Sequence, residues 1–332
     1  MDIILHGDAL QELKKLPSDS VDCCITSPPY YQLRDYGVEG QIGLEKNVEE
    51  YIEKLVEVFR EVRRLLKPDG TLWVNIADSY AGSGKGWKEK PENIEKHLQK
   101  SNKGWIESNL PPTRAKNVKP KDMLGIPWLL ALALRNDGWY LRQDIIWNKP
   151  NCMPESVNDR CTKAHEYIFL LSKSRKYYFD YEAIKEPCVG YDKSSPRGSK
   201  GTLTPNAGRR NKGNRKTFRG GGVYTGGKSF ENHVFAENET HGNIQNDTGL
   251  RRKRSVWNVS TQGSKEAHYA TFPDRLIEPC VLAGARKGGV VLDPFAGSGT
   301  VGRVAEENGR KYILIELKKE YVEIIKKWAS PC

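Results

Sequence analysis

Long apolar runs are missing from this chain of 332 residues. No stretch approaches the ~20 consecutive apolar residues that a membrane-spanning helix needs. The first ten residues, MDIILHGDAL, carry an acid at position 2 and only a brief apolar stretch, which is unlike a secretory signal. We therefore expect a cytoplasmic protein with no membrane contact.

Paired cysteines are also missing. The seven cysteines are odd in number and include no CxxC spacing. Disulfide frameworks and zinc sites usually show an even count or paired spacings. We interpret the cysteines as reduced thiols, and we expect no metal site. The sequence has no internal repeat either, so repeat architectures are not indicated.

Positive charge is abundant and unevenly placed. The net charge is +11, and the stretch from Tyr191 to Arg254 alone holds fourteen Lys and Arg against five Asp and Glu, a net +9. Such a concentration attracts polyanions, although a merely solvated, disordered loop is an open alternative. The densest cluster is Arg251, Arg252, Lys253 and Arg254, which is typical of phosphate contacts.

Strand and helix signals alternate along the rest of the chain. Strands are predicted over 2–8, 21–27, 71–77, 141–149, 165–174 and 176–180, the last two as a hairpin, and over 290–293 and 311–317. Helices are predicted over 9–16 and 47–66, within 123–140 and 270–289, and at 300–307 and 319–328. Asn47 and Glu50 resemble a capping box. This alternation predicts an α/β fold with a mostly parallel sheet. The sequence pattern predicts a long basic loop over 78–121 and an irregular stretch over 190–255.

A glycine loop follows the strand near the C-terminus. The segment VVLDPFAGSGT ends the strand in Asp293 and turns through Gly297 and Gly299 into a helix. Glycines allow close approach of a ligand to the backbone, and the helix offers free N–H groups. Glu316 ends the next strand, where an acid can bind ribose hydroxyls. A nicotinamide dinucleotide is a weaker alternative, since the spacing is not G-x-G-x-x-G.

TSPPY early and DPFAGSGT late resemble the β-group of S-adenosylmethionine-dependent DNA amino-methyltransferases. The resemblance implies a circularly permuted Rossmann-like fold with a mixed, mostly parallel seven-stranded sheet and helices on both faces. It also implies a prokaryotic cell, or a virus-infected one, as the setting. The cofactor-binding residues that it implies are Asp8, Phe272, Pro273, Arg275, Asp293, Phe295, Gly297, Gly299 and Glu316.

The motif Ser27-Pro28-Pro29-Tyr30 matches the family's catalytic motif. An exocyclic amine is a poor nucleophile because its lone pair is delocalised into the ring. Two rigid acceptors, the Ser27 hydroxyl and the Pro28 carbonyl, would free that lone pair. A base must leave the duplex to reach them, and we expect it to stack on Tyr30. For Tyr31 the pattern allows either a place in the site or simple packing in the core. Trp147 fits either a place near the flipped base or the core.

The resemblance implies a site-specific methyltransferase that acts on N4 of cytosine in double-stranded DNA, within a restriction-modification system. A serine before the two prolines usually accompanies cytosine and an aspartate adenine, so N6 of adenine is the alternative. An inactive nucleic-acid-binding protein is the alternative of another class. We expect residues 1–189 to form the catalytic half, 190–262 the target-recognition region and 263–332 the cofactor half. A cognate restriction endonuclease is a possible partner, and the chain is expected to be a monomer or dimer.

Overall fold

The computed structural model describes residues 2–33, 37–38, 40–81, 118–188, 249–261 and 272–329. Most of the predicted loop 78–121 and of the predicted target-recognition region 190–262 lies outside the described residues. The chain divides into two units, Met1–Ile184 with Arg254–Cys332 and, separately, Lys185–Lys253. Residues 254–261 therefore belong with the first unit, although the sequence pattern had grouped them with the recognition region.

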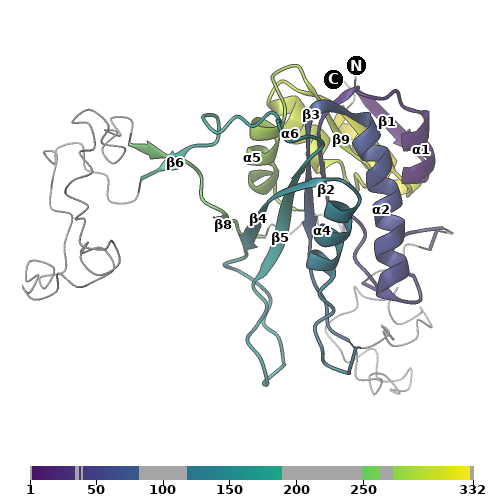
Figure 1. Cartoon of the computed structure of the whole chain (residues 1–332), viewed down its shortest axis with the longest axis vertical. Coiled ribbons are helices and arrows are strands. Elements are labelled where there is room, and N and C mark those ends of the chain that lie inside the picture. Colours follow the sequence, from purple (N-terminus) through teal and green to yellow (C-terminus); the bar gives the residue numbers. More distant parts are fainter. Residues whose placement is uncertain are drawn as a thin grey trace, which may run out of the picture. The chain divides into compact units, whose positions relative to one another are not determined.

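An eight-stranded sheet forms the centre of the first unit (Figure 1). In chain order its strands are β1 (Ile3–His6), β2 (Val21–Thr26), β3 (Leu66–Ile76), β4 (Tyr140–Asn148), β5 (His165–Ser172), β8 (Val256–Asn258), β9 (Val290–Asp293) and β10 (Lys311–Glu316). Their spatial order is β1-β10-β9-β2-β3-β5-β4-β8. Only β5 runs antiparallel to its two neighbours, so the sheet is mixed and mostly parallel.

The family resemblance implied seven strands in the sheet, and the structure adds β8 as an eighth. The three residues of β8 pair in parallel with the end of β4, where Trp147 faces Trp257. A strand of three residues is too short to be recognised from alternation in the sequence. The predicted hairpin was wrong in one respect, since residues 176–180 form no strand. The antiparallel partners of β5 are instead β3 and β4.

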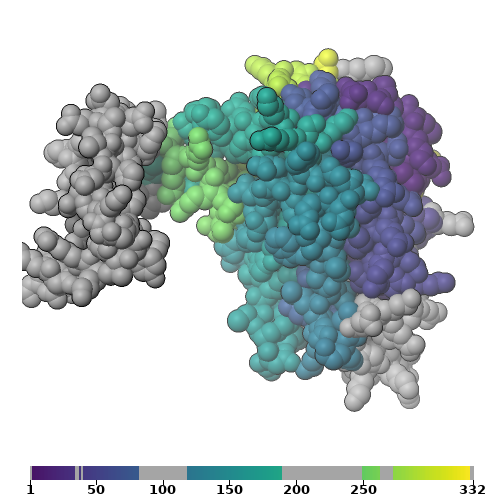
Figure 2. All heavy atoms as spheres, in the orientation of Figure 1, coloured from purple at the N-terminus to yellow at the C-terminus, as the bar shows by residue number. Residues whose placement is uncertain are grey.

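Helices cover both faces of the sheet, as predicted (Figure 1). One face carries α1 (Ala9–Lys15), α2 (Val48–Leu65) and α4 (Ile126–Asn136). The other carries α5 (Asp274–Gly284), α6 (Thr300–Glu307) and α7 (Lys319–Ala329). In the space-filling view the N-terminal residues border α2 (Figure 2), where Arg64 donates to the carbonyl of Leu13. None of the helices in the described ranges is long and apolar enough to cross a membrane.

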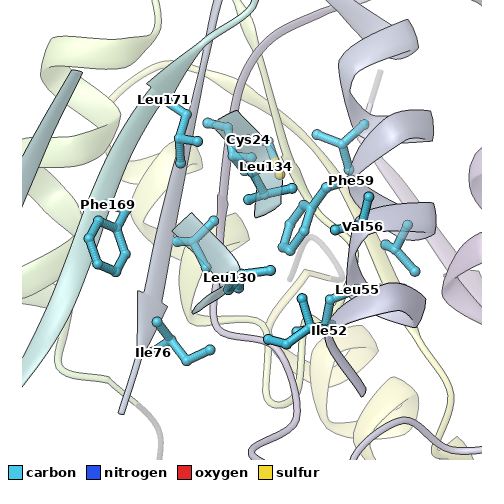
Figure 3. Packing of buried hydrophobic residues seen from close by; sticks show 14 of the residues in the cluster. Cys24, Ile52, Leu55, Val56, Phe59, Ile76, Leu130, Leu134, Phe169 and Leu171 are labelled. Atoms are coloured by element: carbon cyan, nitrogen blue, oxygen red, sulfur yellow. The ribbon is translucent and has the colours of Figure 1, made fainter. Parts of the chain in front are cut away.

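The apolar stripe of α2 forms much of the core on its face (Figure 3). Leu55 and Phe59 are fully buried, and Leu130 and Leu134 of α4 belong to the same cluster. The predicted cap is confirmed, because Asn47 Oδ1 accepts from the Glu50 N–H at 2.8 Å. Burial of one such aliphatic side chain contributes about 1.5–3 kcal/mol. This packing fixes α2 against α4 and β3.

The second unit has a small described part. Its two short strands, β6 (Glu186–Pro187) and β7 (Leu250–Arg251), pair antiparallel. Arg251 Nε donates to Glu186 Oε1 at 2.9 Å across this pair. Of the predicted phosphate-binding cluster, Arg251, Arg252 and Lys253 lie in this unit, and Arg254 lies in the first.

Candidate active site

Two neighbouring strands bring the two motifs together. β2 leads into Ser27-Pro28-Pro29-Tyr30, β9 leads into the glycine loop, and the strands are parallel, with Cys24 opposite Leu292. Loops at the carboxyl ends of adjacent parallel strands are the usual ligand site of such sheets. A pocket lies there, and nine of the predicted site residues line it: Asp8, Ser27, Pro28, Pro29, Tyr30, Phe272, Phe295, Gly297 and Glu316.

The other four predicted cofactor residues do not line the pocket. Pro273 is buried as the N-cap of α5, and Arg275 is exposed on the first turn of that helix. Gly299 is the N-cap of α6 with φ at 83°, and it packs against Trp328. Asp293 is fully buried at the end of β9. Pro273, Asp293 and Gly299 are buried, and each is next in the sequence to a residue that lines the pocket, so they can position the pocket wall. Of the four, only Arg275 is exposed to solvent.

Asp293 links the two motifs. Its Oδ1 accepts from Thr26 Oγ1 at 2.6 Å and from the Phe295 N–H at 3.0 Å. Its Oδ2 is buried and has no hydrogen-bond partner among the described residues. Burial raises the pKa of Asp293 from 3.8 to about 7, against the lowering effect of the two hydrogen bonds. An orphaned polar atom of this kind beside a pocket points to a ligand.

Glu316 holds the glycine loop in place. Its Oε2 accepts from the Gly297 N–H at 2.7 Å, and its Oε1 accepts from the Lys318 N–H at 2.8 Å. Burial raises the pKa of this carboxyl, while the backbone hydrogen bonds oppose the rise. Each carboxylate oxygen can accept a further hydrogen bond. The side chain can therefore shape the loop and still accept from a ligand hydroxyl.

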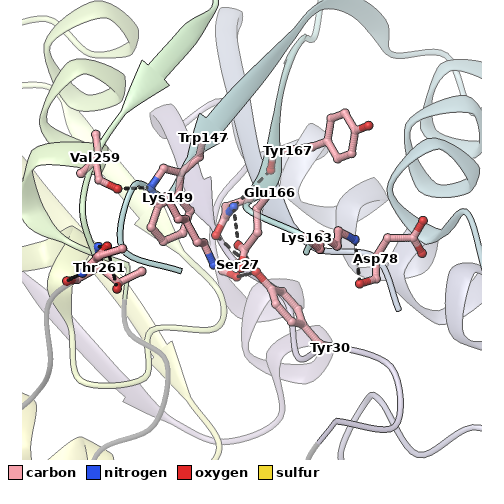
Figure 4. Close-up of polar contacts among 12 residues, drawn as sticks. Ser27, Tyr30, Asp78, Trp147, Lys149, Lys163, Glu166, Tyr167, Val259 and Thr261 are labelled. Carbon is pink, nitrogen blue, oxygen red and sulfur yellow. Dashed lines mark hydrogen bonds and ion pairs between the residues drawn. The ribbon is translucent and has the colours of Figure 1, made fainter. Parts of the chain in front are cut away.

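The predicted catalytic motif is held by a polar network that the sequence did not reveal (Figure 4). Tyr30 Oη donates to Glu166 Oε2 at 2.7 Å, and Asn75 Nδ2 donates to the same oxygen at 3.1 Å. Lys149 Nζ pairs with Glu166 Oε1. Glu166 is 9% exposed. In the sequence, the only sign of a role for Glu166 was its position as an acid inside the apolar run HEYIFLLS. A buried carboxylate needs partners, but the sequence does not show which residues these are.

The sequence left open whether Tyr31 and Trp147 belong to the site or to the core, and both are buried in the core. Tyr31 is 3% exposed and packs against Tyr51 with ring centroids 5.4 Å apart. Trp147 is equally buried, and its Nε1 donates to the carbonyl of Val259 at 2.8 Å. Neither lines the pocket. Lys149 Nζ lies 4.3 Å from the centre of the Trp147 ring, so this ring supports the network rather than the base.

The family model described as DNA methylase, which covers N6 and N4 enzymes, matches residues 21–327. The chain belongs to this DNA methylase family. It is 45% identical to the type II methyltransferase M.SmaI of Serratia marcescens over 97% of this chain and 89% of that protein. It is 42% identical to M.Cfr9I of Citrobacter freundii over 97% of this chain and 85% of the relative.

Solved structures support the fold of this DNA methylase. PvuII DNA methyltransferase, named as cytosine-N4-specific, superposes with a TM-score of 0.59 at 19% identity, covering 99% of this chain and 86% of that one. A modification methylase of Thermus thermophilus complexed with S-adenosylmethionine gives a TM-score of 0.53 at 21% identity, covering 99% and 94%. The chain thus shares its overall fold with these two solved structures.

S-adenosylmethionine is the methyl donor of this family, and the pocket residues fit it. Phe295 and Tyr321 offer aromatic surface, and Glu316 offers a carboxylate for a ribose. Gly297 has φ at 55° with nothing within 4 Å of where a Cβ would stand. Backbone and ligand can therefore approach closely at this point.

Proposed function

We propose that this DNA methylase transfers a methyl group to N4 of a cytosine that is flipped out of double-stranded DNA at a specific site. The observation that carries the proposal is a pocket lined by both Ser27 and Glu316. Glu316 is the polar group expected to bind a ribose, and Ser27 and Pro28 are the rigid acceptors expected to bind an amine. A methyl donor and an acceptor base can meet in one such space.

Ser27 and Pro28 prepare the amine. The hydroxyl of Ser27 and the carbonyl of Pro28 accept the two amine hydrogens, so that the nitrogen becomes pyramidal and its lone pair points at the methyl carbon. The two prolines keep these acceptors in position before the reaction. Tyr51 adds to this rigidity, because its hydroxyl donates to the Pro29 carbonyl at 2.7 Å. The cofactor, when bound, supplies an electrophilic methyl group.

Tyr30 provides the stacking surface for the flipped base. Its ring lines the pocket while its hydroxyl is bound by Glu166. Stacking on an aromatic ring contributes ~1–3 kcal/mol per base, which offsets part of the cost of unpairing. Phosphate contacts are assigned to the region 190–262, with Arg251, Arg252, Lys253 and Arg254 as the main candidates. These contacts position the duplex without selecting the base.

The choice of cytosine is supported by the serine at position 27. In the family pattern, serine at this position usually accompanies N4-cytosine and aspartate N6-adenine. The solved structure with the same fold that is named cytosine-N4-specific adds support. Adenine N6 remains the alternative substrate, since a hydroxyl can accept from either amine. A protein that binds nucleic acid without methylating it is the alternative of another class.

A role in restriction-modification is supported by the relatives' names. M.SmaI and M.Cfr9I are both type II methyltransferases and align over 97% of this chain. Such a methylase protects the host DNA from an endonuclease that cuts the same site. We therefore propose a cognate restriction endonuclease as the functional partner, with the methylase acting as a monomer or dimer in the prokaryotic cytoplasm.

The test is to methylate a mixed-sequence DNA with tritiated S-adenosylmethionine and to identify the modified nucleoside by mass spectrometry. N4-methylcytosine is expected, at one recurring sequence. N6-methyladenine would overturn the cytosine assignment alone. Cofactor binding without any methyl transfer to DNA would favour the inactive binding protein.

A further inference from the structure

Methylation of an exocyclic amine leaves one proton too many on the nitrogen, and Ser27 has no means of keeping it. A protonated alcohol is strongly acidic, so the hydroxyl can pass a proton on but cannot store it. A carboxylate at this position could do both. If Ser27 is the amine acceptor, as proposed above, the proton needs another destination inside the closed site.

The hydroxyls around Ser27 form a chain that ends on a buried carboxylate (Figure 4). Ser27 Oγ donates to Tyr30 Oη at 3.4 Å, and Tyr30 Oη donates to Glu166 Oε2 at 2.7 Å. Both donors point the same way, from the pocket toward Glu166. The first contact is long, and contacts of this kind often tighten only when the substrate is bound.

Glu166, at the end of this chain of hydroxyls, has charged and polar partners of its own. Its side chain is 12% exposed and is paired with Lys149, whose side chain is 19% exposed. Asn75 Nδ2 donates to Oε2, the same oxygen that receives the tyrosine hydroxyl. A buried carboxylate persists only with such partners. Stacking alone does not require the Tyr30 hydroxyl, since a phenylalanine at position 30 would also offer a ring to a base.

Three nearby carboxylates, those of Glu316, Asp8 and Asp78, are engaged elsewhere, and Asp293 is bonded to Thr26 and not to the hydroxyls of Ser27 or Tyr30. Both oxygens of Glu316 accept backbone N–H groups of the cofactor loop. Asp8 caps α1 through the Gln11 N–H. Asp78, which follows β3, accepts from the N–H groups of Gly125 and Ile126 at the start of α4. Among the described residues, the carboxylate bonded to the catalytic motif is therefore Glu166.

The geometry points to a proton relay from the amine through Ser27 and Tyr30 to Glu166. As the bond between nitrogen and methyl carbon forms and the sulfur–carbon bond of the donor breaks, one N–H bond breaks. That proton moves to Ser27 Oγ, the serine proton moves to Tyr30 Oη, and the tyrosine proton moves to Glu166 Oε2. Glu166 ends neutral, and its proton returns to solvent after the product leaves.

The experiment measures single-turnover methyl transfer with Tyr30→Phe, Glu166→Gln and the double variant. Phenylalanine keeps the ring, and glutamine can still accept a hydrogen bond but cannot take up a proton. Each single variant is expected to slow transfer by ~10²-fold. The double variant should be no slower than either single, because both changes break the same chain. The solvent deuterium isotope effect of the wild type should shrink in all three.

The controls separate the relay from ring positioning and from folding. Tyr177→Phe and Glu61→Gln remove the same groups at surface positions away from the pocket. A fluorescent base analogue at the target position reports base flipping, which is expected to stay unchanged in every variant. If Glu166→Gln fails to fold because Lys149 loses its partner, Tyr30→Phe still tests the relay with the ion pair intact.

Wild-type rates in both Tyr30→Phe and Glu166→Gln would overturn the relay and leave the proposed function standing. Loss of base flipping in step with rate would also overturn it, since the network would then only orient the ring. The wild-type reaction is the check on the function itself. If the wild type transferred no methyl group, both the proposed function and the relay would fail.

Discussion

Thr26 Oγ1 donates a hydrogen bond of 2.6 Å to Asp293 Oδ1, across 267 positions of the sequence. It joins the last residue of β2 to the last residue of β9, just before the catalytic motif and the cofactor loop begin. The separation of the two loops is therefore set by paired strands and a buried contact. The reaction needs the methyl carbon and the amine nitrogen to be held about 3–3.5 Å apart and aligned, and this link makes the two loops more rigid.

The pKa of Asp293 makes stability depend on pH in a defined direction. Burial raises this pKa from 3.8 to about 7, so the folded chain keeps a proton that the unfolded chain releases between these values. The free energy of unfolding must then fall as pH rises from about 4 to 7, by roughly 1.4 kcal/mol for each pH unit. The total over this window is of order 4 kcal/mol.

Asp293→Asn should remove this contribution. The measurement is denaturant unfolding of the wild type and of Asp293→Asn at several pH values from 4 to 8. Subtracting the two unfolding free energies at each pH removes the contributions of the other carboxyl groups, which both proteins share. Relative to the variant, the wild type is expected to lose stability as pH rises and to level off above pH 7. A difference that does not change with pH would show that Asp293 titrates alike in both states.

Alanine substitutions at the two glycines of the cofactor loop, Gly297 and Gly299, should lower stability by different amounts. At Gly297, with φ at 55°, an added Cβ meets nothing within 4 Å. At Gly299, with φ at 83°, it would lie 2.6 Å from Trp328 Cζ2 and 2.9 Å from Ile325 Cγ1. Gly297→Ala should cost only the left-handed strain of about 1–2 kcal/mol. Gly299→Ala adds overpacking of about 1–3 kcal/mol.

Thermal unfolding and cofactor calorimetry together check this contrast. Gly299→Ala should be the less stable protein. Gly297→Ala should show the larger loss of cofactor affinity relative to its loss of stability, because its Cβ would enter the space beside the pocket. Equal stabilities would mean that Trp328 moves aside freely.

Glu316→Ala should weaken cofactor binding. Losing a charge-assisted hydrogen bond costs about 1.5–3 kcal/mol, or roughly ten- to a hundred-fold in affinity. The variant also removes the acceptor for the Gly297 N–H, so the loop itself should loosen. Glu323→Ala is the matched control, since this acid pairs with Lys326 on the outer face of α7. Calorimetry that finds equal affinities for the wild type and Glu316→Ala would exclude Glu316 from the site.

The next prediction concerns DNA binding by the basic cluster of Arg251, Arg252, Lys253 and Arg254. The side chain of Arg251 is 28% exposed, whereas Arg252 and Arg254 are exposed residues and can reach a phosphate more easily. Neutralising Arg252 and Arg254 should flatten the salt dependence of DNA binding by a slope of about 0.9 for each phosphate that the protein no longer neutralises. Arg251→Gln should change it less, and cofactor affinity should not move. An unchanged slope would leave the assignment of this region to DNA without its main support.

The sequence predicted the elements that depend on local pattern. Helix α2 was evident from the apolar spacing of Ile52, Leu55 and Phe59, and its cap from Asn47. The pocket was predicted because two short motifs each carry their own chemistry. The position of β5 between β3 and β4 was not, since pairing of distant strands leaves no local signal. The same reason hid Glu166, whose partners Tyr30 and Asn75 are 136 and 91 positions away.

Ser27 and Tyr30 carry the last prediction. Ser27→Ala removes one preorganised acceptor, an effect of order 10²–10³ in rate. Tyr30→Ala removes the stacking surface, at ~1–3 kcal/mol per base, and also deprives Glu166 of its tyrosine donor. Both should slow methyl transfer far more than they weaken cofactor binding, because Glu316, the proposed ribose-binding acid, is untouched. Both should still bind DNA, since the phosphate contacts are assigned to another part of the chain.

The two variants should differ in one measurable respect. With a fluorescent base analogue at the target position, Ser27→Ala is expected to flip the base as the wild type does, because the ring remains. Tyr30→Ala is expected to lose part of that signal. The matched control is Tyr177→Ala, which removes an aromatic ring outside the pocket. A normal rate in Ser27→Ala would mean that the hydroxyl is not an acceptor for the amine, and the acceptor would then have to be sought in the backbone of Pro28 alone.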